Sequence, residues 1–229
     1  MMQMLPLIPA LFFSICFADV LFSDDFNDGD DNGWTHIGAA SFEVIDYEYF
    51  IYTDGDRGRG KSLNGDDSGM MSTSDYSVLC SILIECGTEG GILVRYSGLD
   101  QWYYRMVLKP NTSRILLERK NDSGASLVKD QYNFALSYDV PYWIRLQVDE
   151  DFIQGRIWTG SVDDEPDEWH LEAVDSVQPD AGSFGLFAGG FGKSKVSWSS
   201  IFDDVVVSTP LLQELSQVTW ASIKSAGYR

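Results

Sequence analysis

Two carboxylates stand among apolar residues near the two ends of the sequence, where a negative charge needs a partner. Asp24 has a phenylalanine two positions away on either side, and in a β-strand, with its period of two, these side chains would share one face. In the segment IFDDVVVS the same alternation groups Asp203 with Val205 and Val207. Burying a lone carboxylate is costly unless a hydrogen bond or a metal ion compensates it.

A calcium ion would satisfy both carboxylates. Ca²⁺ takes about six to eight oxygen ligands, including carboxylates and backbone carbonyls. Because the first and last strands of a sandwich often adjoin, we expect Asp24 and Asp203 to share one structural Ca²⁺, with Asp28 or Asp30 as further ligands. The alternative is that hydrogen bonds alone hold Asp24 and that the acidic segment DDFNDGDDNGWT is a solvated loop.

The same acidic segment also matches the first half of a calcium-binding loop. Asp28, Asp30, Asn32 and Gly33 fit the pattern D-x-[DN]-x-[DN]-G. The twelfth position of that loop would be Ala39 and not glutamate, which excludes a complete EF-hand. A partial calcium loop and a solvated turn are both consistent with this composition.

Aromatic and arginine side chains fall on the polar side of several alternating segments. In YWIRLQV, for example, Trp143 and Arg145 alternate with the apolar residues. Aromatic rings stack on the C–H faces of sugars, and arginine grips hydroxyl or carboxylate groups. One sheet surface is therefore predicted to carry a ligand-binding set: Arg95, Tyr103, Arg105, Trp143, Arg145, Arg156 and Trp158. The ligand would be a polysaccharide or oligosaccharide, with a preference for anionic glycans; the alternative is an ordinary exterior face whose arginine stems shield the aromatic rings.

Two motif matches resemble catalytic sequences but lack their context. GDRGRGKS, residues 55–62, fits the P-loop template, yet the segment after it has no helical period, so we predict a flexible basic turn. EVIDYE has the spacing E-x-x-D-x-E, which fails the E-x-D-x-x-E signature of laminarinase-type glycosidases. The two histidines, His36 and His170, have no nucleophile or ligand cluster beside them in the sequence.

Charge and targeting signals restrict the partners and the location of the protein. The 229 residues carry a formal net charge of −19, which argues against nucleic acid as a partner, because phosphate binding needs clustered lysine and arginine. Residues 1–18 are predicted to be a signal peptide: the apolar run is too short to span a bilayer, and small residues precede a cleavage site after Ala18. We expect a secreted or cell-surface protein without a membrane span.

Two further features concern cysteines and the C-terminus. Cys80 and Cys86 lie six residues apart on one predicted strand, beyond disulfide reach of each other, so we interpret them as core thiols, with an intermolecular disulfide as the alternative. Residues 210–229 change in character and resemble the short sorting or attachment tails of exported bacterial proteins, with a packed terminal helix as the alternative.

The apolar period is two along most of the chain, with turn residues about every eight to twelve positions. This pattern is typical of an all-β sandwich. We predict that residues 19–209 form one jelly-roll β-sandwich of two antiparallel sheets.

The order of several segments resembles that of one fold family. DDFNDGDDNGW, FEVIDYEYF, GILVRYSGLDQWYYRMVL, YWIRLQVDEDFIQGRIW, GSFGLFAGG and FDDVVVS occur in the order found in concanavalin A-like, laminin-G-like jelly-roll domains of bacterial secreted glycosidases and surface proteins. The resemblance implies sugar binding and a structural Ca²⁺ between the N- and C-terminal strands. The chain departs from the family at Tyr47, where a glycine usually follows the aspartate.

These observations favour a non-catalytic carbohydrate-binding or adhesive domain. The first alternative is a glycan-degrading hydrolase or lyase that uses the same face, with Glu85, Asp149 or Glu150 as candidate acids. The second is a structural envelope protein without a ligand.

Overall fold

The computed structural model describes residues 18–53, 58–64, 71, 73–98, 101–178, 180–190 and 197–210. Most of the predicted signal peptide and nearly all of the predicted C-terminal tail, residues 1–17 and 211–229, lie outside these ranges. Within the described ranges, no helix has the length and apolar character needed to cross a membrane.

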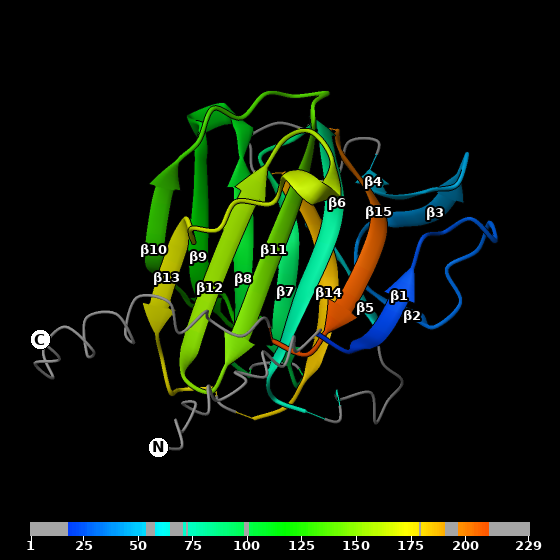
Figure 1. Cartoon of the computed structure of the whole chain (residues 1–229). Coiled ribbons are helices and arrows are strands. Elements are labelled where there is room, and N and C mark those ends of the chain that lie inside the picture. Colours follow the sequence, from blue (N-terminus) through cyan, green and yellow to red (C-terminus); the bar gives the residue numbers. More distant parts are fainter. Residues whose placement is uncertain are drawn as a thin grey trace, which may run out of the picture.

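The described residues form two antiparallel sheets (Figure 1). The eight-stranded sheet contains, in order, β13 (Leu171–Val174), β12 (Phe152–Trp158), β11 (Pro141–Asp149), β6 (Tyr76–Cys86), β15 (Trp198–Ser208), β4 (Glu48–Thr53) and β3 (Ser41–Ile45), with β1 (Val20–Asp24) also paired to β15. The seven-stranded sheet contains, in order, β10 (Ser126–Asn133), β9 (Arg114–Lys120), β8 (Tyr103–Lys109), β7 (Glu89–Tyr96), β14 (Ser183–Gly190), β5 (Gly58–Asn64) and β2 (Trp34–Gly38). Two 3₁₀ turns, η1 (Pro110–Thr112) and η2 (Val162–Asp164), lie in connections.

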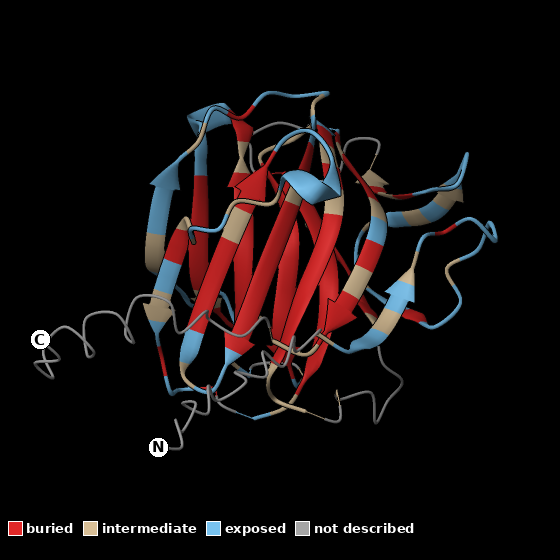
Figure 2. Ribbon diagram, viewed as in Figure 1, coloured by how far each residue is buried: buried red, intermediate tan, exposed pale blue. Residues whose placement is uncertain are grey.

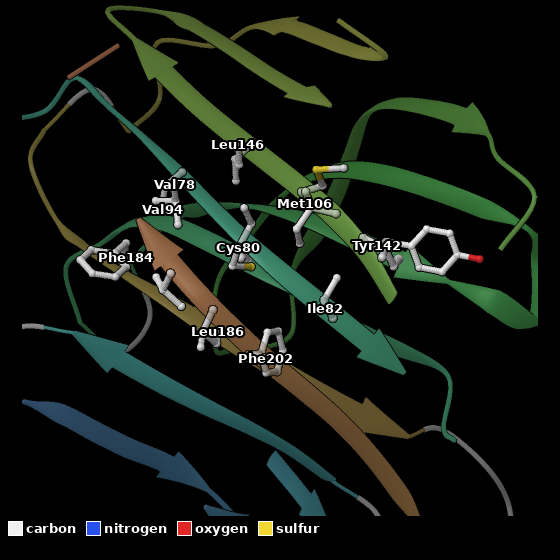
Figure 3. Packing of buried hydrophobic residues seen from close by; sticks show 14 of the residues in the cluster. Val78, Cys80, Ile82, Val94, Met106, Tyr142, Leu146, Phe184, Leu186 and Phe202 are labelled. Carbon is white, nitrogen blue, oxygen red and sulfur yellow. The ribbon is translucent and has the colours of Figure 1, made fainter. Parts of the chain in front are cut away.

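The main core fills the space between the two sheets. Figure 3 shows Val78, Cys80 and Ile82 of β6 in the same cluster as Met106 of β8 and Leu186 of β14. Fully burying an aliphatic side chain of this size contributes about 1.5–3 kcal/mol. Figure 2 shows that the central strands of both sheets are buried along most of their length. The predicted jelly-roll sandwich of two antiparallel sheets is confirmed.

Two local predictions can be compared with the strands. Residues 58–62 of the P-loop-like segment belong to β5, so the predicted flexible turn is wrong for them, and Lys61 and Ser62 lie inside the sheet. The rest of the motif that precedes them, residues 55–57, lies outside the described residues. Cys80 is buried and Cys86 half-buried, and both are free thiols, as predicted.

Candidate functional site

A second apolar cluster covers the outer face of the seven-stranded sheet, the face turned away from the main core. Four of its members, Leu93, Val107, Leu116 and Phe187, each lie between two residues of the main core along their strands. The whole cluster consists of Leu63, Leu93, Tyr96, Tyr103, Val107, Leu116 and Phe187, all of them buried. Large side chains on neighbouring strands cover one another on this face, so it differs from an ordinary solvated exterior.

A pocket of about 110 Å³ lies on this outer face. Leu93 of β7 and Phe187 of β14 supply its apolar part. The rest of its lining is polar or small: Arg59, Lys61, Tyr103, Arg105, Lys120, Asp122 and Gly124. Pockets for drug-sized ligands measure about 300–1,000 Å³, so this one accommodates a single ring or substituent and not an extended chain.

Arg105 is the centre of a buried charge network beside the pocket. Its Nε and Nη2 atoms lie 2.8 and 2.5 Å from Oε2 of Glu118, and its Nη1 lies 3.2 Å from Oε1 of Glu89. That oxygen of Glu89 also accepts a 2.7 Å hydrogen bond from Nε of Arg59. Burial by itself would raise the pKa of Glu89, but the charges of Arg105 and Arg59 outweigh burial and hold this pKa below its ordinary value. Glu89 is therefore an ionised hydrogen-bond acceptor at neutral pH.

Asp122 organises the other side of the pocket. It accepts hydrogen bonds from Lys61 Nζ at 2.6 Å, from the Tyr96 hydroxyl at 2.7 Å and from the Tyr103 hydroxyl at 3.3 Å. The Lys61 ammonium also lies 4.6 Å from the centre of the Tyr96 ring and 5.3 Å from that of Tyr103. Burial would raise the pKa of Asp122, but the hydrogen bonds from Lys61 and Tyr96 hold it below its ordinary value. These contacts fix the two tyrosine rings in place.

Lys120 is the cation of the pocket that lacks a partner among the described residues. The pairing of β8 with β9 places it directly opposite Tyr103. Lys120 is only 4% exposed, and its ammonium forms no hydrogen bond or ion pair with any residue that the structure describes. Burial, followed by the positive charges of Arg59 and Arg105, lowers the pKa of Lys120.

Of the seven residues predicted to bind a ligand, Tyr103 and Arg105 lie at this pocket. Arg95 does not, because it is fully buried at the end of β7, with a left-handed backbone at φ 55°. Its guanidinium donates to the carbonyl oxygens of Ser74, Gln178 and Glu150. Arg95 thus ties loops together, and its predicted outward position is wrong.

The remaining four predicted residues, Trp143, Arg145, Arg156 and Trp158, lie on β11 and β12. These strands belong to the eight-stranded sheet, so the four residues face outward on the opposite side of the sandwich from the pocket. The prediction of one shared surface is wrong, because alternation along a strand identifies the outward face but not the sheet to which the strand belongs.

The contacts of these four residues match the alternative of a shielded exterior face. The rings of Trp143 and Trp158 stack with centroids 6.4 Å apart. Arg145 and Arg156 both pair with Glu165, at 2.6 and 3.1 Å. Trp158 is only 5% exposed. Little of its ring is left for a ligand.

The sequence interpretation missed most of the pocket, which comprises residues from several distant segments. The missed lining residues are Arg59, Lys61, Leu93, Lys120, Asp122, Gly124 and Phe187, and the missed partners of Arg105 beside the pocket are Glu89 and Glu118. One signal was available: the short NTS turn between β8 and β9 sets their register, which places Lys120 opposite Tyr103 and Glu118 opposite Arg105.

The three acids considered for catalysis do not come together. Glu85 is exposed near the end of β6, whereas Asp149 and Glu150 are exposed at the turn between β11 and β12. The antiparallel pairing of β6 with β11 puts that turn and Glu85 at opposite ends of the eight-stranded sheet. They therefore cannot form a pair of cooperating carboxyl groups.

Hydrogen bonds satisfy the carboxylate of Asp24. It accepts a 2.7 Å hydrogen bond from the indole Nε1 of Trp34 and a 3.0 Å bond from the backbone N–H of Phe26. Further along the loop, Asp28 accepts from the backbone of Asp30, and the Asp30 carboxylate caps the following turn. In the described part of the chain, no three acidic, histidine or cysteine residues are grouped so as to hold a metal ion.

Asp203 lies on the other face of the eight-stranded sheet from Asp24. A bulge in β15 interrupts the pairing with β6 between Asp203 and Val206, and Asp204 has a φ of 50°. Val205 and Val207 point into the core, whereas Asp203, next to the core residue Phe202, points outward. The predicted apolar stripe around Asp203 is wrong because the bulge reverses the alternation. Asp24 and Asp203 therefore do not meet to share an ion, and calcium binding by the acidic segment stays a prediction.

The two packed sheets define a concanavalin A-like jelly roll, a fold of carbohydrate-associated proteins. Comparison of the sequence with known protein families gives no match. The fold is nevertheless similar to that of the carbohydrate-binding module CBM66 from Bacillus subtilis, with a TM-score of 0.60 and 18% identity, over 77% of this chain and 96% of that one. It is also similar to a β-1,3-1,4-glucanase (lichenase) from a mouse hindgut metagenome, with a TM-score of 0.57 and 11% identity, over 83% of this chain and 99% of that one.

A curated relative is similar in sequence. The extracellular exo-α-L-arabinofuranosidase of Streptomyces chartreusis is 29% identical over a match of 159 residues, and the match covers 67% of this chain and 18% of the enzyme. The chain thus spans less than a fifth of that relative's length. The similar folds include a binding module and a hydrolase, so the fold by itself does not choose between binding and catalysis.

Proposed function

We propose that the protein is a non-catalytic carbohydrate-binding module and that the pocket on the seven-stranded sheet is its sugar site. The observation that carries this proposal is the combination of aromatic rings and fixed charged groups in one small pocket. Phe187 and Tyr103 line the pocket with rings that are only 1% and 2% exposed, so they supply its apolar wall and not an open stacking platform, while Lys61, Lys120 and Asp122 offer donors and an acceptor. Sugar recognition needs both features, because a sugar has apolar C–H faces and a rim of hydroxyl groups.

The ionisation of the pocket supports binding over hydrolysis. A glycoside hydrolase needs one protonated carboxyl group as general acid and a second, ionised one as base or nucleophile. The pKa of Glu89 lies below its ordinary value, and both Glu89 and Glu118 are held by Arg105. These groups act as anchors for the arginine and do not donate protons. Burial raises the pKa of Tyr103, which makes its phenol a poor base for a lyase reaction.

The comparisons support an extracellular setting for this function. The similar arabinofuranosidase is an extracellular enzyme, and the similar binding module has the same fold. Together with the predicted signal peptide, they support secretion or display at the cell surface. A module of this kind would hold its protein close to a glycan.

Glycan-array binding followed by NMR mapping tests the proposal. Amide shifts of the ¹⁵N-labelled protein should change around Tyr103, Lys120 and Phe187 when a bound glycan is titrated, with no reaction product. Amide shift changes centred on Trp143 would instead locate the binding site on the eight-stranded sheet. New reducing or unsaturated ends on the glycans would establish a glycan-degrading enzyme instead. Absence of binding to every glycan on the array would favour a structural envelope protein.

A further inference from the structure

The pocket carries an excess of positive charge, although the whole protein has a net charge of −19. Its cations are Arg59, Lys61, Arg105 and Lys120, and the carboxylates in contact with them are Glu89, Glu118 and Asp122. Among the described residues, four positive groups thus meet three negative ones. The contacts show which cation is left over, because the three carboxylates form ion pairs with Arg59, Lys61 and Arg105.

Lys120 is that group. It is 4% exposed, and no described residue accepts a hydrogen bond from its ammonium. The ammonium is not among the fully buried side-chain atoms that lack a hydrogen-bond partner, so it is accessible at the pocket. A lysine with so little exposed surface is usually paired. Arg59 and Arg105 add repulsion, which the charges of Glu118 and Glu89 only partly offset. An anion that enters the pocket would supply the missing partner.

We infer that the pocket binds a sugar residue through an anionic substituent, a carboxylate or a sulfate, that pairs with the ammonium of Lys120. This inference rests on the proposed carbohydrate-binding function and names the class of sugar that the same site takes. Arg105 is a positioning residue in this arrangement, because Glu118 and Glu89 already accept from its three nitrogen atoms. Lys61 is held in the same way by Asp122.

The size of the pocket limits the ligand further. A volume of about 110 Å³ takes one substituted ring. The charge outside the pocket opposes a densely charged chain, since −19 over the whole protein repels polyanions within the Debye length of about 8 Å at physiological ionic strength. The ligand is therefore a glycan with a single or terminal anionic residue.

The test compares ligands that differ only in charge. An array of short oligosaccharides ending in uronic acids, their carboxyl-reduced counterparts and sulfated analogues is probed with the wild-type protein and with Lys120→Met. The acidic ligands should bind roughly tenfold to a hundredfold more tightly than the reduced ones, the range expected for a hydrogen bond to a charged group. Lys120→Met should remove this difference, and Lys120→Arg should retain part of it.

Control variants separate local from general effects. Lys129→Met removes the same charge from β10, where Lys129 pairs with Asp175 at 2.9 Å, and should leave the preference unchanged. Lys120→Met should fold with a melting temperature close to that of the wild type, since it removes no hydrogen bond or ion pair with a described residue. Preference for sulfated over uronic ligands would identify sulfate as the anion.

Two outcomes overturn the inference, and they differ in what they say of the proposed function. Equal binding of acidic and reduced ligands, unaltered in Lys120→Met, refutes anion recognition but leaves carbohydrate binding standing. Absence of binding to every glycan on the array refutes both.

Discussion

Asp203→Asn should make the protein more stable at neutral pH, because the structure surrounds this carboxylate with other acids. Asp203 is half-buried on the outer face of β15, and its Oδ1 accepts a 2.8 Å hydrogen bond from the backbone of Asp204. Burial, followed by the negative charges of Asp204, Glu48 and Asp25, raises its pKa from 3.8 to about 6. Asparagine keeps an oxygen that can accept the hydrogen bond and removes the charge.

The sign and size of the effect follow from this shift. The folded protein binds the proton of Asp203 more tightly than the unfolded chain does, so protonation of Asp203 stabilises the fold. This contribution to stability is fully present below about pH 4 and is lost as the pH rises through about 6. A rise of roughly two pKa units corresponds to about 3 kcal/mol as an upper limit. Because solvent screens a half-buried group, we expect about 1–2 kcal/mol in favour of asparagine at pH 7.5.

Urea unfolding of both proteins at pH 4, 5, 6 and 7.5 measures this difference. The free energies of unfolding should agree near pH 4 and diverge as the pH rises, and taking the difference between the proteins cancels the other titrating groups. A difference that does not depend on pH, or a variant less stable than the wild type at pH 7.5, would show that another charge already compensates Asp203.

Three further predictions concern the pocket, the opposite face and calcium. Arg105→Gln should lower the free energy of unfolding by about 3–5 kcal/mol in urea titrations, since it leaves the buried Glu118 without its cation and the buried Glu89 with Arg59 alone; a loss below 1 kcal/mol would show that water reaches them. Trp143→Ala should leave glycan affinity in calorimetry within error of the wild type, because Trp143 lies on the other sheet; a large loss would place a site there. For calcium, predicted from the sequence at the acidic segment, thermal melts in chelator and in excess Ca²⁺ should differ for the wild type and less for Asp28→Asn, whereas Asp203→Asn should leave the difference unchanged; identical wild-type curves would contradict an ion at the acidic residues.

The sequence allowed the fold to be predicted because alternation with a period of two depends only on local geometry. The inward residues of β11, such as Ile144 and Leu146, occupy the core as predicted. The prediction of which side each residue of β15 faces failed at a β-bulge. The extra residue at Asp204 puts the following valines on the opposite face from the one that simple alternation predicts, and no glycine there signals the bulge.

The site was less predictable because it depends on which strands become neighbours. Tyr103 and Lys120 are paired through a short turn, which is a local relation. Phe187 reaches the same pocket only because β14 lies between β7 and β5. Long-range pairing of this kind leaves no periodic signal in a single sequence, so outward-facing arginines from both sheets were grouped on one surface.

The charge network beside the pocket explains how a strongly acidic protein can present a positive site. Buried ion pairs are held in place because breaking one leaves an uncompensated charge. Glu118 and Glu89 therefore fix Arg105, and Asp122 fixes Lys61, so these cations cannot turn outward to acids elsewhere on the surface. Lys120, set among fixed cations and without a hydrogen bond or ion pair to a carboxylate of the described residues, keeps its charge available to a ligand. The cation that is left without an ion pair determines the ligand selectivity of such a site. Substitution of Lys120 alone should therefore change the selectivity without altering the fold.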